Sequence, residues 1–232
     1  MSCSLSALGS SSLPWNQRHE ITSLERKLTR FILIRHGQTE WNRMERFRGR
    51  AELALDDTGI RQAEAAAERL SGWQIVAVYS SPLRRALMTA QVLASRLGLA
   101  VQPLDGLIDI DFGDWQGLSG KEAAAQDGYL YRQWLERPHE VRFPHGESLQ
   151  DVRQRITAAI DSLVKNHGEQ TVVLVSHNVV CRVLLCVVLG LDNSHFWQLG
   201  QDNSAVNVFE VSDGKTVLSL LNDTCHLKHL GL

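Results

Sequence analysis

Residues 31–37 read Phe-Ile-Leu-Ile-Arg-His-Gly, so four apolar residues stand directly before an arginine, a histidine and a glycine. Such a run is typical of a strand buried on both faces, as in a parallel sheet between two layers of helices. Open α/β sheets bind their ligands at the carboxyl ends of the strands. We therefore expect a ligand site at Arg35, whose donors suit phosphate, and at His36, a nucleophile usable near neutral pH. The alternative, a surface arginine and histidine at a strand end, is the better reading of one such tripeptide alone.

A second copy of the arrangement favours the ligand site. Residues 171–178 read Thr-Val-Val-Leu-Val-Ser-His-Asn, and an apolar pattern of helical spacing follows them. Two buried strands that each end in a histidine can bring both imidazoles, those of His36 and His177, into one crevice. A lone histidine is usually structural, whereas a pair at equivalent strand ends indicates shared chemistry.

A third strand, residues 75–79, leads into a segment that carries positive charge. Ser81 suits a helix N-cap and Pro82 the first helical position, which predicts a helix over 82–97. Arg84 and Arg85 then lie in the first turn, where cations oppose the helix dipole unless an anion compensates. Solvated surface arginines are the alternative, and the spacing does not say which of the two points inward.

These segments resemble the histidine phosphatase superfamily, also called the phosphoglycerate mutase-like family, from about residue 30 to residue 230. The hallmark Leu-x-Arg-His-Gly-x-Thr is present at 33–39. Segments 55–63, 80–90, 146–148 and 175–177 resemble the further motifs of the family in the expected order. The second of these segments identifies Arg85, rather than Arg84, as the phosphate ligand.

The resemblance implies a phosphatase of the histidine acid type that needs neither metal nor cofactor. His36 would attack the phosphoryl group and hold it as a phosphohistidine, which splits one displacement into two. The transferred oxygens would be bound by Arg35, Arg85 and His177, with Asn42 as a neutral donor.

The proton for the leaving group comes from a glutamate in the family, and here an aspartate stands in its place. The corresponding stretch is 107–117, and Asp109 occupies the glutamate's position with one methylene less. An aspartate can serve as the acid if its surroundings raise its pKa. The alternative is that Asp109 only tethers a loop, and that the chain is a catalytically weakened, phosphate-binding regulatory protein.

The connection between Trp134 and the Gly-Glu-Ser motif at 146–148 separates phosphatase from mutase. Mutases of the family carry a long insertion here that shields the phosphoenzyme from water. This connection is short, so we expect a phosphatase, with cofactor-dependent phosphoglycerate mutase activity as the alternative. The partner is then a small phosphorylated metabolite.

Four loop arginines could bind a second anionic group or simply form a solvated basic loop: Arg43, Arg46, Arg48 and Arg50.

The order of strands and helices predicts the fold class α/β, a three-layer α/β/α arrangement with a mostly parallel central sheet and an antiparallel edge. The expected strands are 31–35, 75–79, 100–103, 171–176, 205–211 and 216–221, and the expected helices are 57–70, 82–97, 119–135, 147–167 and 178–189. Asp213-Gly214 predicts a hairpin between the last two strands. Residues 1–29 are expected to form a flexible N-terminal tail with a short helix at 21–28. Residues 30–232 are expected to form the histidine phosphatase domain, with small cap insertions near 43–52 and 119–145.

Composition limits the remaining possibilities. The 232 residues carry a formal net charge of −2, with a pI near 6.5, which argues against a nucleic-acid partner. The apolar stretch 179–191 is interrupted by an arginine and too short to span a membrane. Cys181 and Cys186 are expected to be buried thiols, while Cys3 and Cys225 have no evident partner, which favours the cytoplasm. We expect a monomer or a homodimer.

Overall fold

The computed structural model describes residues 28–231, and the short helix expected at 21–28 and Cys3 therefore lie outside what can be compared. Six strands in this range form one mixed sheet of order β3-β2-β4-β1-β5-β6. Neighbours among β3, β2, β4 and β1 run parallel, whereas β5 pairs antiparallel with both β1 and β6, which confirms the predicted sheet. The bounds are β1 Thr29–Arg35, β2 Ile75–Ser80, β3 Val101–Pro103, β4 Thr171–Ser176, β5 Val206–Ser212 and β6 Lys215–Asp223.

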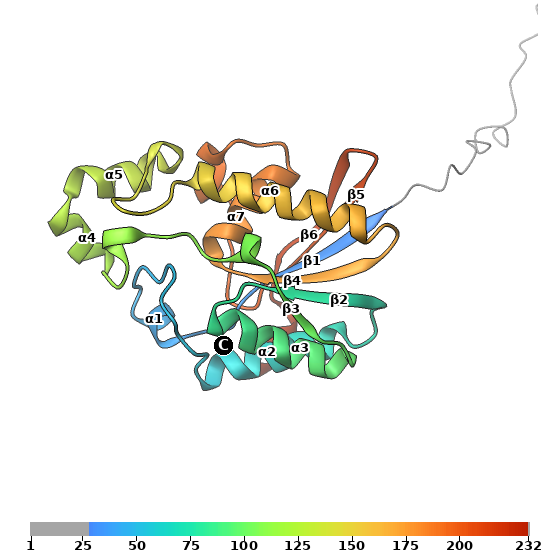
Figure 1. Cartoon of the computed structure of the whole chain (residues 1–232). Helices are drawn as coiled ribbons and strands as arrows, with labels where there is room; N and C mark the ends of the chain where they lie inside the picture. The colour runs from blue at the N-terminus through green and yellow to red at the C-terminus, as the bar shows by residue number, and fades with distance from the viewer. Residues whose placement is uncertain (1–27, 232) are drawn as a thin grey trace, which may run out of the picture.

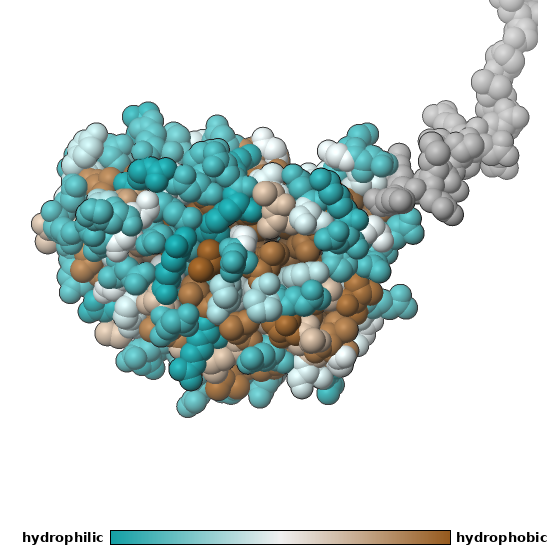
Figure 2. Space-filling view, viewed as in Figure 1, coloured by the Kyte–Doolittle hydropathy of each residue, from teal (hydrophilic) through white to brown (hydrophobic). Residues whose placement is uncertain are grey.

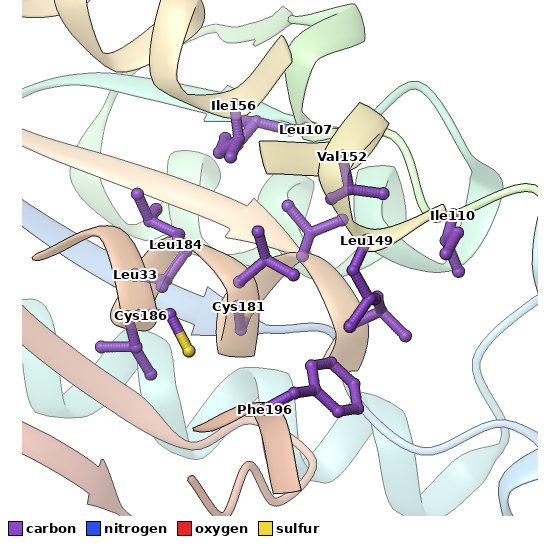
Figure 3. Close-up of a cluster of buried hydrophobic side chains, with 14 of the residues drawn as sticks. Leu33, Leu107, Ile110, Leu149, Val152, Ile156, Cys181, Leu184, Cys186 and Phe196 are labelled. Atoms are coloured by element: carbon purple, nitrogen blue, oxygen red, sulfur yellow. The ribbon is translucent and has the colours of Figure 1, made fainter. Parts of the chain in front are cut away.

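Helices cover both faces of this sheet (Figure 1). Helices α2 (Asp57–Leu70) and α3 (Arg84–Leu97) lie on one face, and α6 (Leu149–Asn166) and α7 (Asn178–Val188) lie on the other. Side chains that alternate along β1 serve the two layers. Ile32 and Ile34 pack toward α2 and α3, while Leu33 packs toward α6 and α7, as Figure 3 shows. The buried run that suggested the fold is thus shared by both cores.

Short helices gather at the carboxyl end of the parallel strands, at the left of Figure 1. They are α1 (Glu40–Arg43), α4 (Gly120–Gln126) and α5 (Gly128–Glu136). The expected single helix over 119–135 is wrong, because Asp127 interrupts it and its carboxylate accepts the backbone N–H of Leu130 as the N-cap of α5. Short 3₁₀ helices occupy Asp105–Leu107, Gly113–Trp115, Pro138–Glu140, Asn193–Gln198 and Cys225–Leu230.

Two further boundaries differ from the prediction. β1 begins at Thr29, which we had assigned to the N-terminal tail, and the Thr29 side chain is fully buried. α3 begins at Arg84 with Leu83 as N-cap, two residues after the predicted start at Pro82, and the Ser81 hydroxyl both accepts the backbone N–H of Leu83 and contacts a histidine. The hairpin is confirmed, with Asp213 and Gly214 both at positive φ as a tight turn requires.

The surface is largely polar on the face drawn in Figure 2. Apolar groups gather there mainly over the region in which β2, β3 and α3 lie in Figure 1. No helix within residues 28–231 has the length and apolar character that crossing a bilayer requires. Cys181 and Cys186 are buried free thiols as predicted, and Cys225 is exposed.

Candidate active site

His36 and His177 lie side by side because their strands are neighbours in the sheet. β1 and β4 pair in parallel with Arg35 opposite Ser176, so each histidine follows its strand at the same level. The centroids of the two imidazole rings are 5.1 Å apart. The first long helices after these strands, α2 and α7, lie on opposite faces of the sheet. Open α/β sheets bind their ligands where successive connections switch faces in this way. The structure thus brings the two imidazoles together, as the paired strands predicted.

The loop after β1 is held close to α2 by glycine. A Cβ atom on Gly37 would lie only 2.4 Å from the carbonyl oxygen of Gly59, so a side chain does not fit there. The backbone N–H of Gly37 also donates to the Thr89 hydroxyl on α3. Both contacts fix the backbone that carries His36.

The hydrogen bond of the His36 ring determines which nitrogen can react. Nδ1 lies 2.7 Å from the carbonyl oxygen of Gly37. A carbonyl only accepts, so Nδ1 carries the proton and Nε2 keeps its lone pair. Burial lowers the pKa of His36 well below its usual value, and the charges of Arg85 and Arg35 lower this pKa further. His36 is therefore neutral at pH 7, with Nε2 available as a nucleophile.

Arg85 is buried at the start of α3, whereas its neighbour Arg84 is exposed. The Arg85 guanidinium donates to the carbonyl oxygens of Gly49 and Ala51, at 2.7 Å each. It also pairs with Asp109 Oδ2 at 3.0 Å. The structure thus places Arg85, and not Arg84, beside the two histidines, the choice that the family motif implied.

Positive charge is concentrated around His36. Arg35 donates to the carbonyl oxygen of Gln201, and the Nε atoms of Arg35 and Arg85 are buried without a partner among the described residues. Burial, together with the charge of Arg48, lowers the pKa of Arg35 to about 9, so Arg35 remains charged at pH 7. Burial and Arg85 also lower the pKa of Arg48. Crowded guanidinium groups with unused donors favour the binding of an anion.

Asp109 lies within this cluster and is almost fully buried. Its Oδ2 pairs with Arg85 and lies 3.7 Å from His177 Nδ1, while its Oδ1 accepts the backbone N–H of Ile110. Burial raises the pKa of Asp109, although Arg85 and Arg48 act in the opposite direction. Burial of this kind favours the protonated form of a carboxyl, which can then donate its proton.

The other carboxylates near this loop are engaged elsewhere. Arg155 and Arg50 both pair with Glu147, which also accepts the backbone N–H of Asp111. Asp111 pairs with Arg50 and caps a turn, and Asp114 is exposed. Asp109 is the carboxyl of this loop that faces the two histidines. Within residues 28–231, no three His, Cys, Asp or Glu side chains come together as a metal ion would need.

A cleft of about 650 Å³ opens in front of the cluster. Arg35, Arg48 and Asp109 contribute to its lining, together with Asn42 from α1. The Asn42 Oδ1 accepts the backbone N–H and the hydroxyl of Thr39, so its Nδ2 is the donor left for a ligand. The cleft is also lined by residues of α5, of α7 and of the 3₁₀ helix Asn193–Gln198: Tyr131, Trp134, Leu135, Asn178, Arg182, Phe196 and Trp197.

Comparison with known proteins agrees with this geometry. The family model of the histidine phosphatase superfamily (branch 1) matches residues 31–224. The chain belongs to the histidine phosphatase superfamily. It is 38% identical over 200 residues to phosphoserine phosphatase 1 of Hydrogenobacter thermophilus, a match that covers 86% of this chain and 95% of the relative. It is 31% identical to the metal-independent phosphoserine phosphatase of Arabidopsis thaliana, over 91% of this chain and 89% of the relative.

A solved structure is similar as well. It is a mutant phosphoserine phosphatase of Entamoeba histolytica in complex with phosphoserine, with a TM-score of 0.78, 30% identity and coverage of 86% of this chain and 99% of that one. Membership of the family and these phosphatase relatives make the chain a phosphoric monoester hydrolase, as the sequence predicted.

Several residues of this site are not predicted from the sequence. The Ser81 hydroxyl lies 2.7 Å from His177 Nε2, whereas we had assigned Ser81 to a helix cap. The carbonyl oxygen of Gln201 accepts from both Arg35 and Asn178, and a backbone carbonyl leaves no signal in a sequence. Burial, followed by the charges of Arg85 and His36, lowers the pKa of His177 well below its usual value, which makes this ring neutral too. Ser81 could have been found, because it follows β2 as His36 and His177 follow their strands.

Proposed function

We propose that this phosphatase hydrolyses phosphomonoesters through a phosphohistidine on His36 and without a metal ion. The observation that carries the proposal is the hydrogen bond from His36 Nδ1 to the Gly37 carbonyl in a buried, cationic site. It keeps Nε2 unprotonated and fixes the ring for attack on phosphorus. In the first step, the Nε2–P bond forms as the bond from phosphorus to the ester oxygen breaks.

The charge of the transferred group is balanced by fixed donors. Arg35, Arg85 and His177 bind the phosphoryl oxygens, and Asn42, which lines the cleft together with Arg35, donates its amide. Asp109 gives its proton to the departing alkoxide. It then accepts a proton from the water that attacks the phosphohistidine, so phosphate leaves and both residues return to their starting forms.

The free site suggests how Asp109 obtains its proton. Without substrate, Asp109 neutralises Arg85 through their ion pair. An arriving phosphate competes for Arg85 and brings its own negative charge next to the carboxylate. Both changes add to burial in raising the pKa of Asp109. Substrate thus favours the protonated acid that its own cleavage requires.

Water rather than a second substrate molecule is the proposed acceptor. The cleft is lined by exposed side chains of the short cap and of the segment Asn193–Gln198, with Leu135 50% and Trp197 43% accessible to solvent. The alternative of a phosphate-binding regulatory protein needs no nucleophile, yet His36 is held neutral and oriented. We also propose the cytoplasm as the location, because Cys181 and Cys186 are free thiols.

Phosphoserine is the first substrate to test, since the relatives with the names given above are phosphoserine phosphatases. Released phosphate is measured for a panel of phosphomonoesters, each with and without a metal chelator, for the wild type and for His36→Ala. The proposal expects turnover that the chelator leaves unchanged and that His36→Ala abolishes. No hydrolysis of any monoester by a folded wild type, or turnover that the chelator removes, would contradict it.

A further inference from the structure

Arg182 lies in the cleft outside the phosphate-binding cluster, and the proposed chemistry does not use it. It lies on α7 one turn after Asn178, so both side chains point to the same side of the helix. Its Nε and Nη1 atoms are buried and have no hydrogen-bond partner among residues 28–231. No carboxylate of that part of the chain lies within ion-pair distance of it. Asp202, the nearest acidic influence on its charge, is hydrogen-bonded to Asn222 instead.

Two aromatic rings hold the Arg182 guanidinium in place. Its Cζ lies 5.2 Å from the ring centroid of Phe196 and 4.9 Å from that of Trp197. Figure 3 shows Phe196 beside the turn of α7 that carries Cys181, the residue before Arg182. These rings are themselves fixed, since Trp197 Nε1 donates to the carbonyl oxygen of Trp134 at 2.8 Å. An arginine stacked in this way keeps its charge and loses little freedom when it binds a ligand.

The loop arginines that we had considered for a second anionic group are mostly engaged. Arg46 donates to the Gly117 carbonyl and pairs with Glu122, and Arg50 pairs with acidic residues of the acid loop and the Glu-Ser motif. Arg48 belongs to the phosphate cluster, where its charge acts on Arg35 and on Asp109. Arg43 also lines the cleft but is exposed, whereas Arg182 combines a place in the cleft lining with buried nitrogen atoms that have no partner in the described structure.

We infer that Arg182 and the rings of Phe196 and Trp197 form a subsite for a carboxylate on the substrate, at the opposite end of the molecule from the phosphate. This inference rests on the proposed function. His177 is the N-cap of α7 and Arg182 is five residues further on, which is roughly 7.5 Å along the helix axis. A short carbon chain with a phosphate at one end and a carboxylate at the other fits that separation. A single guanidinium matches a carboxylate of one charge, whereas the phosphate end gathers three arginines and two histidines.

The test compares two substrates that differ only in the carboxylate, phosphoserine and phosphoethanolamine. For the wild type, kcat/KM is expected to be higher with phosphoserine. Arg182→Gln should lower kcat/KM for phosphoserine roughly 10- to 100-fold, mainly through KM, because a charge-assisted hydrogen bond is lost. It should leave phosphoethanolamine and p-nitrophenyl phosphate within about twofold. Arg182→Lys, which keeps the charge, should restore part of the preference.

The matched control is Arg132→Gln, an exposed arginine on α5 that does not line the cleft, and it should leave the preference unchanged. The proposed subsite would be overturned if Arg182→Gln lowered kcat/KM equally for both substrates. It would also be overturned if the wild type showed no preference for phosphoserine. Calorimetric affinities of both compounds for wild type and Arg182→Gln report the subsite even without turnover. Absence of p-nitrophenyl phosphate hydrolysis in the wild type would instead count against the proposed function.

Discussion

At the scale of single residues, two adjacent arginines on α3 have opposite surroundings. Arg85 is enclosed by Gly49, Ala51 and Asp109, while the Arg84 side chain is exposed. Arg85→Ala should lower kcat/KM about 100-fold or more, as expected when a preorganised charge donor to the transition state is removed. Arg84→Ala should remain within about twofold of the wild type. Steady-state kinetics with p-nitrophenyl phosphate, together with thermal melts to verify folding, measure both, and similar effects would mean that Arg85 does not contact the phosphoryl group.

The role of Asp109 as proton donor can be tested by comparing substrates with different leaving groups. An alkoxide needs a proton to depart, whereas p-nitrophenolate needs little help, and both substrates use the same phosphate site. Asp109→Asn should therefore slow phosphoserine hydrolysis at least about tenfold more than p-nitrophenyl phosphate hydrolysis. Asp109→Glu restores the residue of the family and should retain activity if the site accommodates one more methylene. Equal losses on the two substrates in Asp109→Asn would indicate that this carboxyl only positions phosphate or holds the loop.

At the scale of elements, the loop that carries Asp109 is tied to α6. Arg155 donates to the carbonyl oxygens of Gly106 and Asp109 and pairs with Glu147. Arg155→Met should leave the Asp109 carboxyl less firmly positioned while the phosphate-binding residues stay unchanged. A displacement of a catalytic group by about 1 Å can lower the rate up to 100-fold. We expect a larger loss of kcat with phosphoserine than with p-nitrophenyl phosphate. Arg142→Met, an exposed arginine paired with Asp151 on the same helix, is the control, and an equal response of both variants would refute the positioning role.

The elements that the sequence predicted correctly are those with one dominant physical signal. The apolar runs before His36 and His177 match β1 and β4 closely, because only a strand covered on both faces buries every residue. The break at Asp127 was missed because one polar residue in a helical pattern can stay helical or act as a cap. In the sequence, Arg182 is only an interruption of an apolar stretch. Its place in the proposed subsite depends on contacts with the rings of Phe196 and Trp197, which come from a separate segment of the chain.

At the scale of the whole molecule, two buried histidines and the half-buried His226 link stability to pH. Burial lowers the pKa of His36 and His177 well below the usual value, and that of His226 to about 4. The unfolded chain takes up these protons near pH 6.5 while the folded chain does not, so stability falls as pH drops below that value. Each neutral histidine contributes a slope of about 1.4 kcal/mol per pH unit there. Asp109, whose raised pKa acts in the opposite direction, offsets part of this loss.

Urea unfolding at pH 7.5 and at pH 5.0 measures this dependence. The free energy of unfolding should be smaller at pH 5.0, and His226→Gln, which lies outside the catalytic site, should make the decrease shallower. The usual carboxylate pKa near 3.9 lies below this range, so the histidines dominate the trend. A free energy of unfolding that is the same at both pH values would show that the histidines are not held neutral in the folded protein.

The covalent intermediate is the central claim of this account, and one measurement addresses it directly. Wild-type protein is mixed with ³²P-labelled phosphoserine, quenched within milliseconds in alkali to preserve a phosphohistidine, digested and mapped by mass spectrometry. We expect label on the peptide that contains His36, on Nε2, and none in His36→Ala. Label on His177 or another residue, or phosphate release by the wild type with no labelled protein at any quench time, would contradict the account.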